Sequence, residues 1–195
     1  MKNQYLISCL LLLLISCDSA KSTLNDFDGN QYKTQKYGNT IWMTENLRTT
    51  RDKHGNELMY YFPNEDPTKS KGFGLLYDFE TACKVCPDGW KLPSNEDWEA
   101  LFDLENQNIA SIYKDSQYWT EGKSNQSEFS VRPAGYGNNG EHDNNFNSKA
   151  ILWSSSKEDD HFVWTYVLEL GKDSIRKASQ HPEYAFSVRC IKSES

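Results

Sequence analysis

The sequence lacks the residue arrangements that bind metal ions or cofactors, or that form recognised catalytic sites. Its four histidines lie outside any His-Glu-x-x-His spacing, and its one Cys-x-x-Cys pair, Cys83 and Cys86, has no second pair to complete a zinc site. No serine has a Gly-x-Ser-x-Gly setting, and we interpret the glycine-rich stretch Gly135-Tyr-Gly137 with Gly140 as a turn, not as a loop that holds a phosphate. We therefore expect no metal, no cofactor and no enzymatic activity.

Positive charge is scarce as well. The chain has 21 Lys and Arg residues against 28 Asp and Glu residues, which gives a formal net charge of −7. A protein that binds the phosphate backbone of a nucleic acid needs a basic face. Nucleic acid is therefore not expected among the partners of this protein.

The chain begins with the layout of a secretory signal. A short polar stretch containing Lys2 precedes an apolar run over 6–15, which Leu14-Ile15-Ser16-Cys17 closes. The run has about ten residues where a membrane span needs roughly 20, so a spanning anchor is disfavoured. The closing tetrapeptide resembles the bacterial lipobox, whose cysteine is acylated. We predict a signal peptide over 1–16, lipidation of Cys17, a tether over 17–26, and attachment through the lipid to the cell envelope, at the outer membrane, facing the periplasm or the surface.

The cysteines that follow Cys17 predict a disulfide. Cys83, Cys86 and Cys190 remain in an exported, oxidising context, where disulfides form and persist. The Cys83–Cys86 spacing is that of a thiol redox motif, but the strand-helix-strand context of thioredoxin-like proteins is missing. We expect one long-range structural disulfide and one remaining thiol.

Aromatic residues are abundant, at 13% of the chain with 6 Trp and 11 Tyr. One interpretation is an aromatic core packed between short strands. The other is a face that stacks on carbohydrate rings. Composition does not choose between them, although a core is the commoner arrangement.

The order of apolar and turn residues predicts an α+β domain. Strands over 31–37 and 40–43 flank Gly38-Asn39 and form a hairpin. A helix begins at Ser94, which forms a capping-box pattern with Asp97 ahead of Trp98, Leu101 and Phe102 on one helix face. The remaining expectations are mostly loop over 49–74, a weaker helix over 76–83, and antiparallel strands over 150–153, 162–170 and 185–191.

A long irregular stretch over 121–149 is the candidate binding region. It is rich in Gly, Asn and Ser, and long loops of this kind are uncommon in compact domains and often functional. Amides and carboxylates form hydrogen bonds with sugar hydroxyls, and a tyrosine can stack on a sugar ring. The alternative is that Asn and Gly only satisfy turn geometry. The candidate residues are Tyr136, Asn138, Asn139, His142 and Asp143.

Six short phrases occur in order along the chain. They are Asp28-Gly-Asn-Gln-Tyr32, Ile41-Trp-Met-Thr-Glu-Asn-Leu47, Cys86-Pro-Asp-Gly-Trp-Lys-Leu-Pro-Ser94 with Asp97-Trp98, Arg132-Pro-Ala-Gly-Tyr136, Trp153-Ser-Ser155 and Phe186-Ser-Val-Arg-Cys190. Together they resemble the Fibrobacter succinogenes major paralogous domain, a module common in lipoproteins of Bacteroidetes and related bacteria. The resemblance covers 27–192.

Two of these phrases also resemble the wider C-type-lectin-like fold, which includes formylglycine-generating enzymes. The resemblance implies short antiparallel sheets, one or two helices and a long irregular loop region. It also implies a disulfide between Cys86 and Cys190, with Cys83–Cys190 as the main alternative. The calcium-binding strings of lectins are absent, and Cys190 is the only late cysteine, so the chemistry of these relatives is not implied. The chain departs from the family pattern at Lys91, where His is frequent, and at Tyr184-Ala185, where Gly is common.

Two classes of function remain open. The first is an envelope-anchored, non-catalytic recognition domain that binds a glycan or a surface protein. The second is a structural or variable surface protein without a fixed ligand. An enzyme of unknown type is a distant third.

Overall fold

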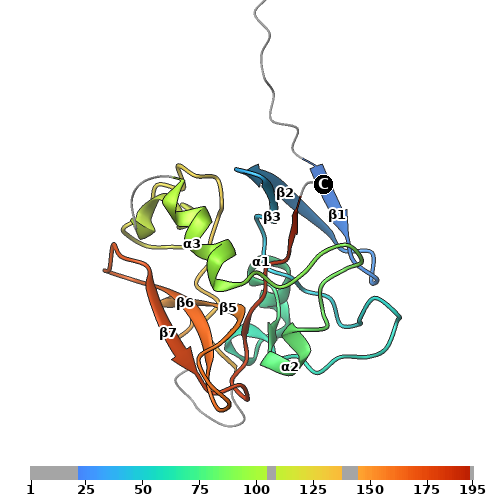
Figure 1. The fold of residues 1–195 in the computed structure, drawn as a ribbon. Coiled ribbons are helices and arrows are strands. Elements are labelled where there is room, and N and C mark those ends of the chain that lie inside the picture. Colours follow the sequence, from blue (N-terminus) through green and yellow to red (C-terminus); the bar gives the residue numbers. More distant parts are fainter. Residues whose placement is uncertain (1–21, 105–108, 138–144, 194–195) are drawn as a thin grey trace, which may run out of the picture.

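The computed structural model describes residues 22–104, 109–137 and 145–193, which fold into two sheets and a few short helices (Figure 1). The predicted α+β class is confirmed, with strands dominating. The predicted signal peptide and Cys17 lie outside the described residues. Within the described ranges no helix is both long and apolar enough to cross a membrane.

The first sheet joins the two ends of the domain. It has four antiparallel strands in the order β1 (Ser22–Asn25), β2 (Gln31–Tyr37), β3 (Thr40–Met43) and β9 (Ile191–Ser193). The predicted hairpin is confirmed, because β2 and β3 pair across the turn. Strand β1 lies within the stretch predicted as a tether, and its pairing with β2 extends the folded domain back to residue 22.

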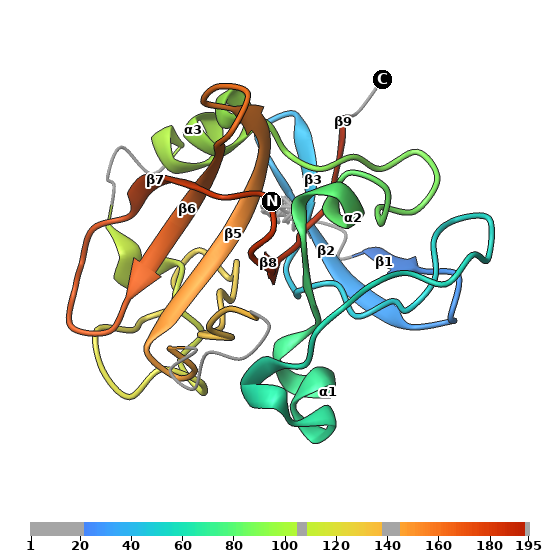
Figure 2. The same ribbon diagram turned by 90° about the horizontal axis from the view of Figure 1, so that it is seen from below.

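The second sheet has five strands. Their order is β4 (Leu76–Tyr77), β8 (Phe186–Ser187), β5 (Lys149–Lys157), β6 (Val163–Glu169) and β7 (Arg176–Gln180). All neighbours are antiparallel except β5 and β8, which are parallel. Figure 2 shows β5, β6 and β7 side by side on one side of the molecule and β1, β2 and β3 on the other.

The prediction of a single strand over 185–191 is wrong. Phe186 and Ser187 form β8 in the five-stranded sheet, whereas Ile191 begins β9 in the four-stranded sheet. Residues 188–190 cross between the sheets, and every residue from 185 to 191 is buried. The alternation of apolar and polar residues there therefore does not mark a strand with one exposed face, because it belongs to a crossover that is buried throughout.

The predicted helix over 76–83 is shorter than expected. Its first two residues form β4, which pairs with β8. The side chain of Asp78 then accepts a hydrogen bond from the backbone N–H of Thr81 at 2.8 Å and caps α2 (Phe79–Ala82). An N-cap carboxylate defines where a helix begins. The two residues before Asp78 therefore lie outside the helix and adopt an extended, strand conformation.

Three other stretches differ from the sequence pattern. The loop predicted over 49–74 contains short helical turns, strand β5 extends beyond 150–153, and β7 was not predicted because it has one apolar residue in five. The additional elements are the 3₁₀ helices Pro63–Glu65, Pro67–Lys69 and Ala110–Ile112, and α1 (Ser70–Phe73).

The longest helix, α3 (Asn95–Asp103), is confirmed with its capping box. The Ser94 hydroxyl accepts from the Asp97 N–H, and the Asp97 carboxylate accepts from the Ser94 N–H at 2.9 Å. The helix packs on β5 and β6, where the Trp98 indole donates to the carbonyl of Trp153 at 3.2 Å. Local capping and one apolar face thus place α3 against the sheet.

The core is rich in aromatic side chains. One buried cluster lies between α3, β3, β5 and β6, and a second lies between the two sheets around the disulfide. The core interpretation therefore holds for most of the tryptophans. Those that are fully buried are Trp42, Trp98, Trp119 and Trp153.

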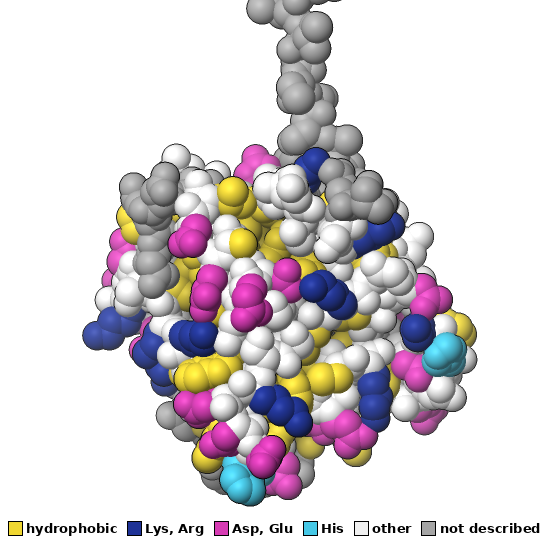
Figure 3. All heavy atoms as spheres, in the orientation of Figure 1, with side chains coloured by type: hydrophobic (Ala, Val, Ile, Leu, Met, Phe, Trp, Pro, Cys, Tyr) yellow, Lys and Arg dark blue, Asp and Glu magenta, His cyan; other side chains and the backbone are white. Residues whose placement is uncertain are grey.

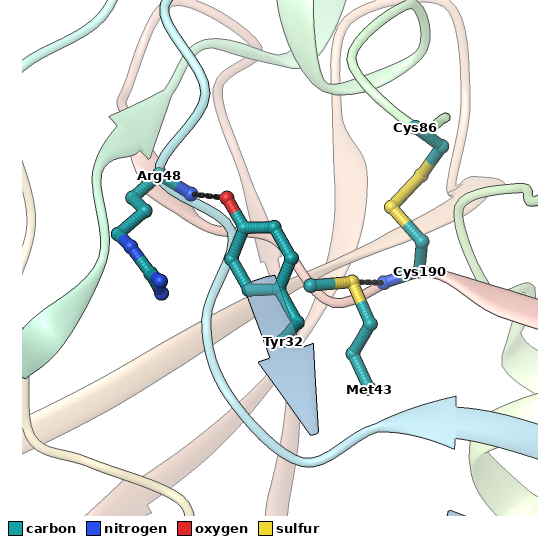
Figure 4. Close-up of a disulfide and its surroundings, with 5 residues drawn as sticks. All are labelled: Tyr32, Met43, Arg48, Cys86 and Cys190. Carbon is teal, nitrogen blue, oxygen red and sulfur yellow. Dashed lines mark hydrogen bonds between the residues drawn. A yellow bond between two sulfur atoms is a disulfide. The ribbon is translucent and has the colours of Figure 1, made fainter. Parts of the chain in front are cut away.

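A disulfide between Cys86 and Cys190 is present, as the resemblance implied (Figure 4). Their Cα atoms are 5.8 Å apart and 104 residues apart in sequence. The Met43 sulfur accepts a hydrogen bond from the Cys190 N–H at 3.3 Å beside it. The alternative pairing through Cys83 is excluded, because Cys83 is a free, exposed thiol.

Candidate functional site

Tyr136 is the one candidate binding residue that lies within the described ranges. The other four, Asn138, Asn139, His142 and Asp143, lie outside the described residues. Backbone bridges from Gly135 to Ala150 and from Gly137 to Ala185 hold the segment that carries Tyr136 against β5 and β8. Its half-buried ring meets the rings of Tyr184 and Phe186, with centroids 6.0 and 6.4 Å away.

Tyr136 borders a groove on one face of the five-stranded sheet. The groove consists of an inner hollow of about 250 Å³ and an outer hollow of about 510 Å³, which adjoin at Gln180 and Tyr184. The inner hollow is lined by Tyr136, Asn145, Lys149, Ile151, Val167, Arg176, Gln180, Tyr184 and Phe186. The outer hollow is lined by Phe162, Ser179, Gln180, His181, Glu183 and Tyr184.

Strand register gathers these side chains. Val167 pairs with Ile151 on one side and with Arg176 on the other, so all three project from the same face of the sheet. Ile151 and Val167 are buried and form an apolar floor, whereas Arg176 is exposed at the rim. An apolar floor with polar groups at its edge is typical of ligand sites.

The inner hollow ends in a cluster of three charged side chains. Lys149 pairs across the strands with Glu169, and their charged atoms are 3.9 Å apart. Arg176 donates from Nη2 to the same Glu169 Oε1 oxygen at 3.1 Å. Two cations thus share one carboxylate oxygen at this end of the groove.

The outer hollow lies between the end of β7 and the β5–β6 loop. Phe162 is 41% exposed, and its ring lies 6.3 Å from that of His181. The imidazole Nδ1 of His181 is 3.6 Å from a carboxylate oxygen of Glu183. The end of β7 and the β5–β6 loop lie at the opposite end of the molecule from the start of β1 (Figure 1).

No metal-binding cluster of three or more His, Cys, Asp or Glu side chains occurs among the described residues. Partial desolvation raises the pKa of the free Cys83 thiol, which disfavours its thiolate form. Across the face in Figure 3, basic and acidic side chains are interspersed, and neither sign covers a broad area.

Two further cationic side chains are buried away from the groove, and they stabilise the fold. Arg189 is fully buried and donates to the side chain of Asn46 at 2.9 Å and to the carbonyls of Phe129 and Ser130. Burial lowers its pKa to about 9. Lys114, also fully buried, donates to two backbone carbonyls near the end of β6. These bonds hold crossing segments together, and neither residue lines the groove.

The family model of the Fibrobacter succinogenes major domain matches residues 36–192 of this chain. The chain belongs to this family. No curated protein and no solved structure is significantly similar to it.

Within this Fibrobacter succinogenes major domain, the phrases that carried the resemblance mostly form the scaffold. Arg189, Trp153 and the disulfide cysteines are buried. Among the groove-lining residues named above, Tyr136 and Phe186 belong to those phrases. Tyr184 lies at a position where the chain departs from the family pattern. The sequence did not indicate Arg176 and Gln180 as binding residues. Strand β7 has no alternating apolar pattern, and the residues that lie beside these two in the groove come from other strands.

Proposed function

We propose that this protein is an envelope-anchored, non-catalytic lipoprotein whose domain recognises a glycan or a surface protein through the groove. The observation that carries the proposal is the groove itself. It combines an apolar floor with aromatic rings and polar groups converging from β5, β6, β7 and the segment before β8. Tyrosine rings and amides are the groups that bind sugars and loops of proteins.

The position of the groove fits an anchored protein. The predicted lipid attachment at Cys17 precedes β1. The two segments that border the outer hollow, the end of β7 and the β5–β6 loop, lie at the far end of the domain from the start of β1 (Figure 1). An outer-membrane anchor at Cys17 would therefore present the groove away from the lipid surface. Two or three acyl chains give stable anchoring, because each buried methylene contributes about 0.8 kcal/mol.

We also propose that the domain has the C-type-lectin-like fold. Two features support this. The chain ends meet in one sheet, and a disulfide links the segment before α3 to the residue before β9. Because the calcium-binding motifs of lectins are absent from the sequence, we propose recognition that does not need calcium.

Anchoring is tested by fractionating cells that express the chain or its Cys17→Ser variant. We expect the first in the membrane fraction and the second in the soluble fraction. Intact mass should show loss of residues 1–16 and added acyl chains. An unmodified Cys17 or a retained Met1 rules out the lipoprotein assignment.

Recognition is tested by screening the soluble fragment 18–195 against glycan arrays and against host and bacterial surface proteins. We expect reproducible binding that Tyr184→Ala abolishes. Trp164→Ala is the matched control, because Trp164 is a half-buried aromatic residue on the opposite face of the same sheet. The absence of binding above background in both screens would favour a structural or variable surface protein.

A further inference from the structure

The charges around the inner hollow narrow the ligand class. We infer that the groove takes an acidic oligosaccharide, whose sugar carboxylate is held by Arg176 and Lys149. This inference rests on the proposed recognition function and specifies its ligand.

The inner hollow is positively charged although the protein is acidic overall. Its charged lining residues among the described ranges are Lys149 and Arg176, both cations. The carboxylate that these two cations contact is that of Glu169, so two positive charges meet one negative charge. The Nη2 donor of Arg176 is used by Glu169, and a guanidinium has further donors for a second carboxylate. This end of the groove therefore complements an anion.

The location of the hollow favours a sugar over an acidic peptide. Strand β6 is paired with β5 on one side and β7 on the other, so its main-chain groups are used within the sheet. The hollow opens on the face of the sheet, where an occupant meets side chains. A peptide that gains affinity by adding a strand needs a sheet edge, which here is the outer edge of β7 and not β5 or β6, whose Ile151 and Val167 form the floor of the hollow. A sugar, in contrast, can be bound by side chains on the face of a sheet and needs no free strand edge.

Aromatic rings beside the cationic end match the faces of sugar rings. Tyr184 lines both hollows, and Phe186 lies nearly parallel behind it, with an interplanar angle of 26° and centroids 6.0 Å apart. Gln180, which also lines both hollows, offers an amide donor and acceptor at their junction. An oligosaccharide can thus lie along the groove with its acidic unit in the inner hollow.

The test uses calorimetric titration of the purified protein, with its disulfide intact. The probes are oligogalacturonate and hyaluronan hexasaccharides, the carboxyl-reduced neutral form of each, and a hexaglutamate peptide. We expect at least one acidic sugar to bind at least about tenfold more tightly than its neutral form. This preference should weaken as salt rises from 50 to 300 mM.

Two neighbouring cations of β7 provide a matched pair of variants. Arg176→Gln should remove the preference for the acidic form, whereas Lys177→Gln should leave it unchanged, because Lys177 pairs with Glu99 on the opposite face. Lys149→Gln is the second variant and should reduce the preference in the same direction. Equal unfolding midpoints establish that each variant is folded.

Several outcomes overturn the inference. They are equal binding of acidic and neutral sugars, hexaglutamate binding as tightly as the sugars, and equal effects of the two β7 variants. If neutral glycans or a surface protein bind and Tyr184→Ala abolishes that binding, the inference fails while the proposed recognition function stands. If no sugar binds, the inference also fails.

Discussion

The two faces of the five-stranded sheet are built from the same strands but differ in what covers them. On one face, Tyr166 and Leu168 pack against Trp98 of α3 in a closed aromatic cluster. On the other face, Ile151 and Val167 lie beneath a groove with half-buried tyrosines at its edge. Both faces therefore contribute to the core, but only the groove face leaves part of its surface open to solvent. Substitutions on the two faces should have separable effects on stability and on binding.

The largest expected effect on the free energy of unfolding comes from removing the disulfide between Cys86 and Cys190. Its cross-link spans 104 residues, and the chain-entropy account gives about 4–5 kcal/mol for a loop of that size. Cys86→Ser with Cys190→Ser should lower the free energy of unfolding by up to that amount, measured by urea unfolding. Cys83→Ser is the control and should change little. Equal stability of the double variant and the native protein would contradict a structural role.

The next effect concerns the face of the sheet that α3 covers. Trp98→Ala removes a fully buried side chain and should cost about 3–5 kcal/mol, because the cavity left behind cannot collapse fully. Trp164→Ala removes a half-buried ring on the same face and should cost about 1 kcal/mol or less. Both costs are read from urea unfolding. The comparison breaks down if a folded Trp98→Ala protein loses ligand binding as Tyr184→Ala does.

A smaller effect concerns the scaffold on the four-stranded side. The Asp28 carboxylate accepts hydrogen bonds from Thr50 and Thr49 and lies 3.0 Å from the Nε of Arg51. Burial alone would raise its pKa, but these hydrogen bonds and the charge of Arg51 hold the pKa below its ordinary value. Asp28→Asn should cost about 2 kcal/mol at pH 7.

The lowered pKa of Asp28 also predicts how the effect of Asp28→Asn on stability depends on pH. A carboxyl whose pKa is lowered by folding stabilises the protein above its unfolded pKa, and that contribution is lost as the pH falls through the folded value. The stability gap between the native protein and Asp28→Asn should therefore narrow below about pH 4. Asp88→Asn, at a strongly exposed carboxylate, is the control. A gap that stays constant from pH 7 to pH 3 would count against the ionised form as the stabilising one.

The smallest expected effect on stability is at the groove rim. Arg176 is exposed, and its ion pair with Glu169 is of the surface kind, which contributes little. Arg176→Gln should therefore change the unfolding midpoint by less than the disulfide, Trp98 and Asp28 variants do. A large loss of stability there would show that the groove rim also stabilises the fold.

Parts of the fold with local signals were predictable from the sequence. The capping box of Ser94 and Asp97 fixed the start of α3, and Gly38-Asn39 marked the β2–β3 turn. Strand β7 was missed because Arg176–Gln180 has one apolar residue, and the pairing with β6 forms it. The crossover at 185–191 was mistaken for one strand, because the polar residues Ser187 and Arg189 alternate with apolar ones, although both are buried.

The groove was less predictable than the fold. Tyr136 was expected from a loop argument, but the groove residues around it come from four separate segments, including Lys149, Arg176 and Tyr184. Their convergence depends on strand register, which one sequence does not specify. The disulfide was predicted through the family resemblance, since spacing alone left the pairing open.

The measurement that tests the central claim most directly is an NMR titration of the isotope-labelled protein with the acidic hexasaccharide that binds most tightly. The account predicts that chemical-shift changes concentrate at the groove, on Tyr184, Gln180, Arg176 and Val167. Residues of the opposite face, such as Leu168 and Trp164, and those of the β1–β2–β3–β9 sheet should change little. Changes centred on that sheet or on the α3 face would contradict the assignment of recognition to the open face.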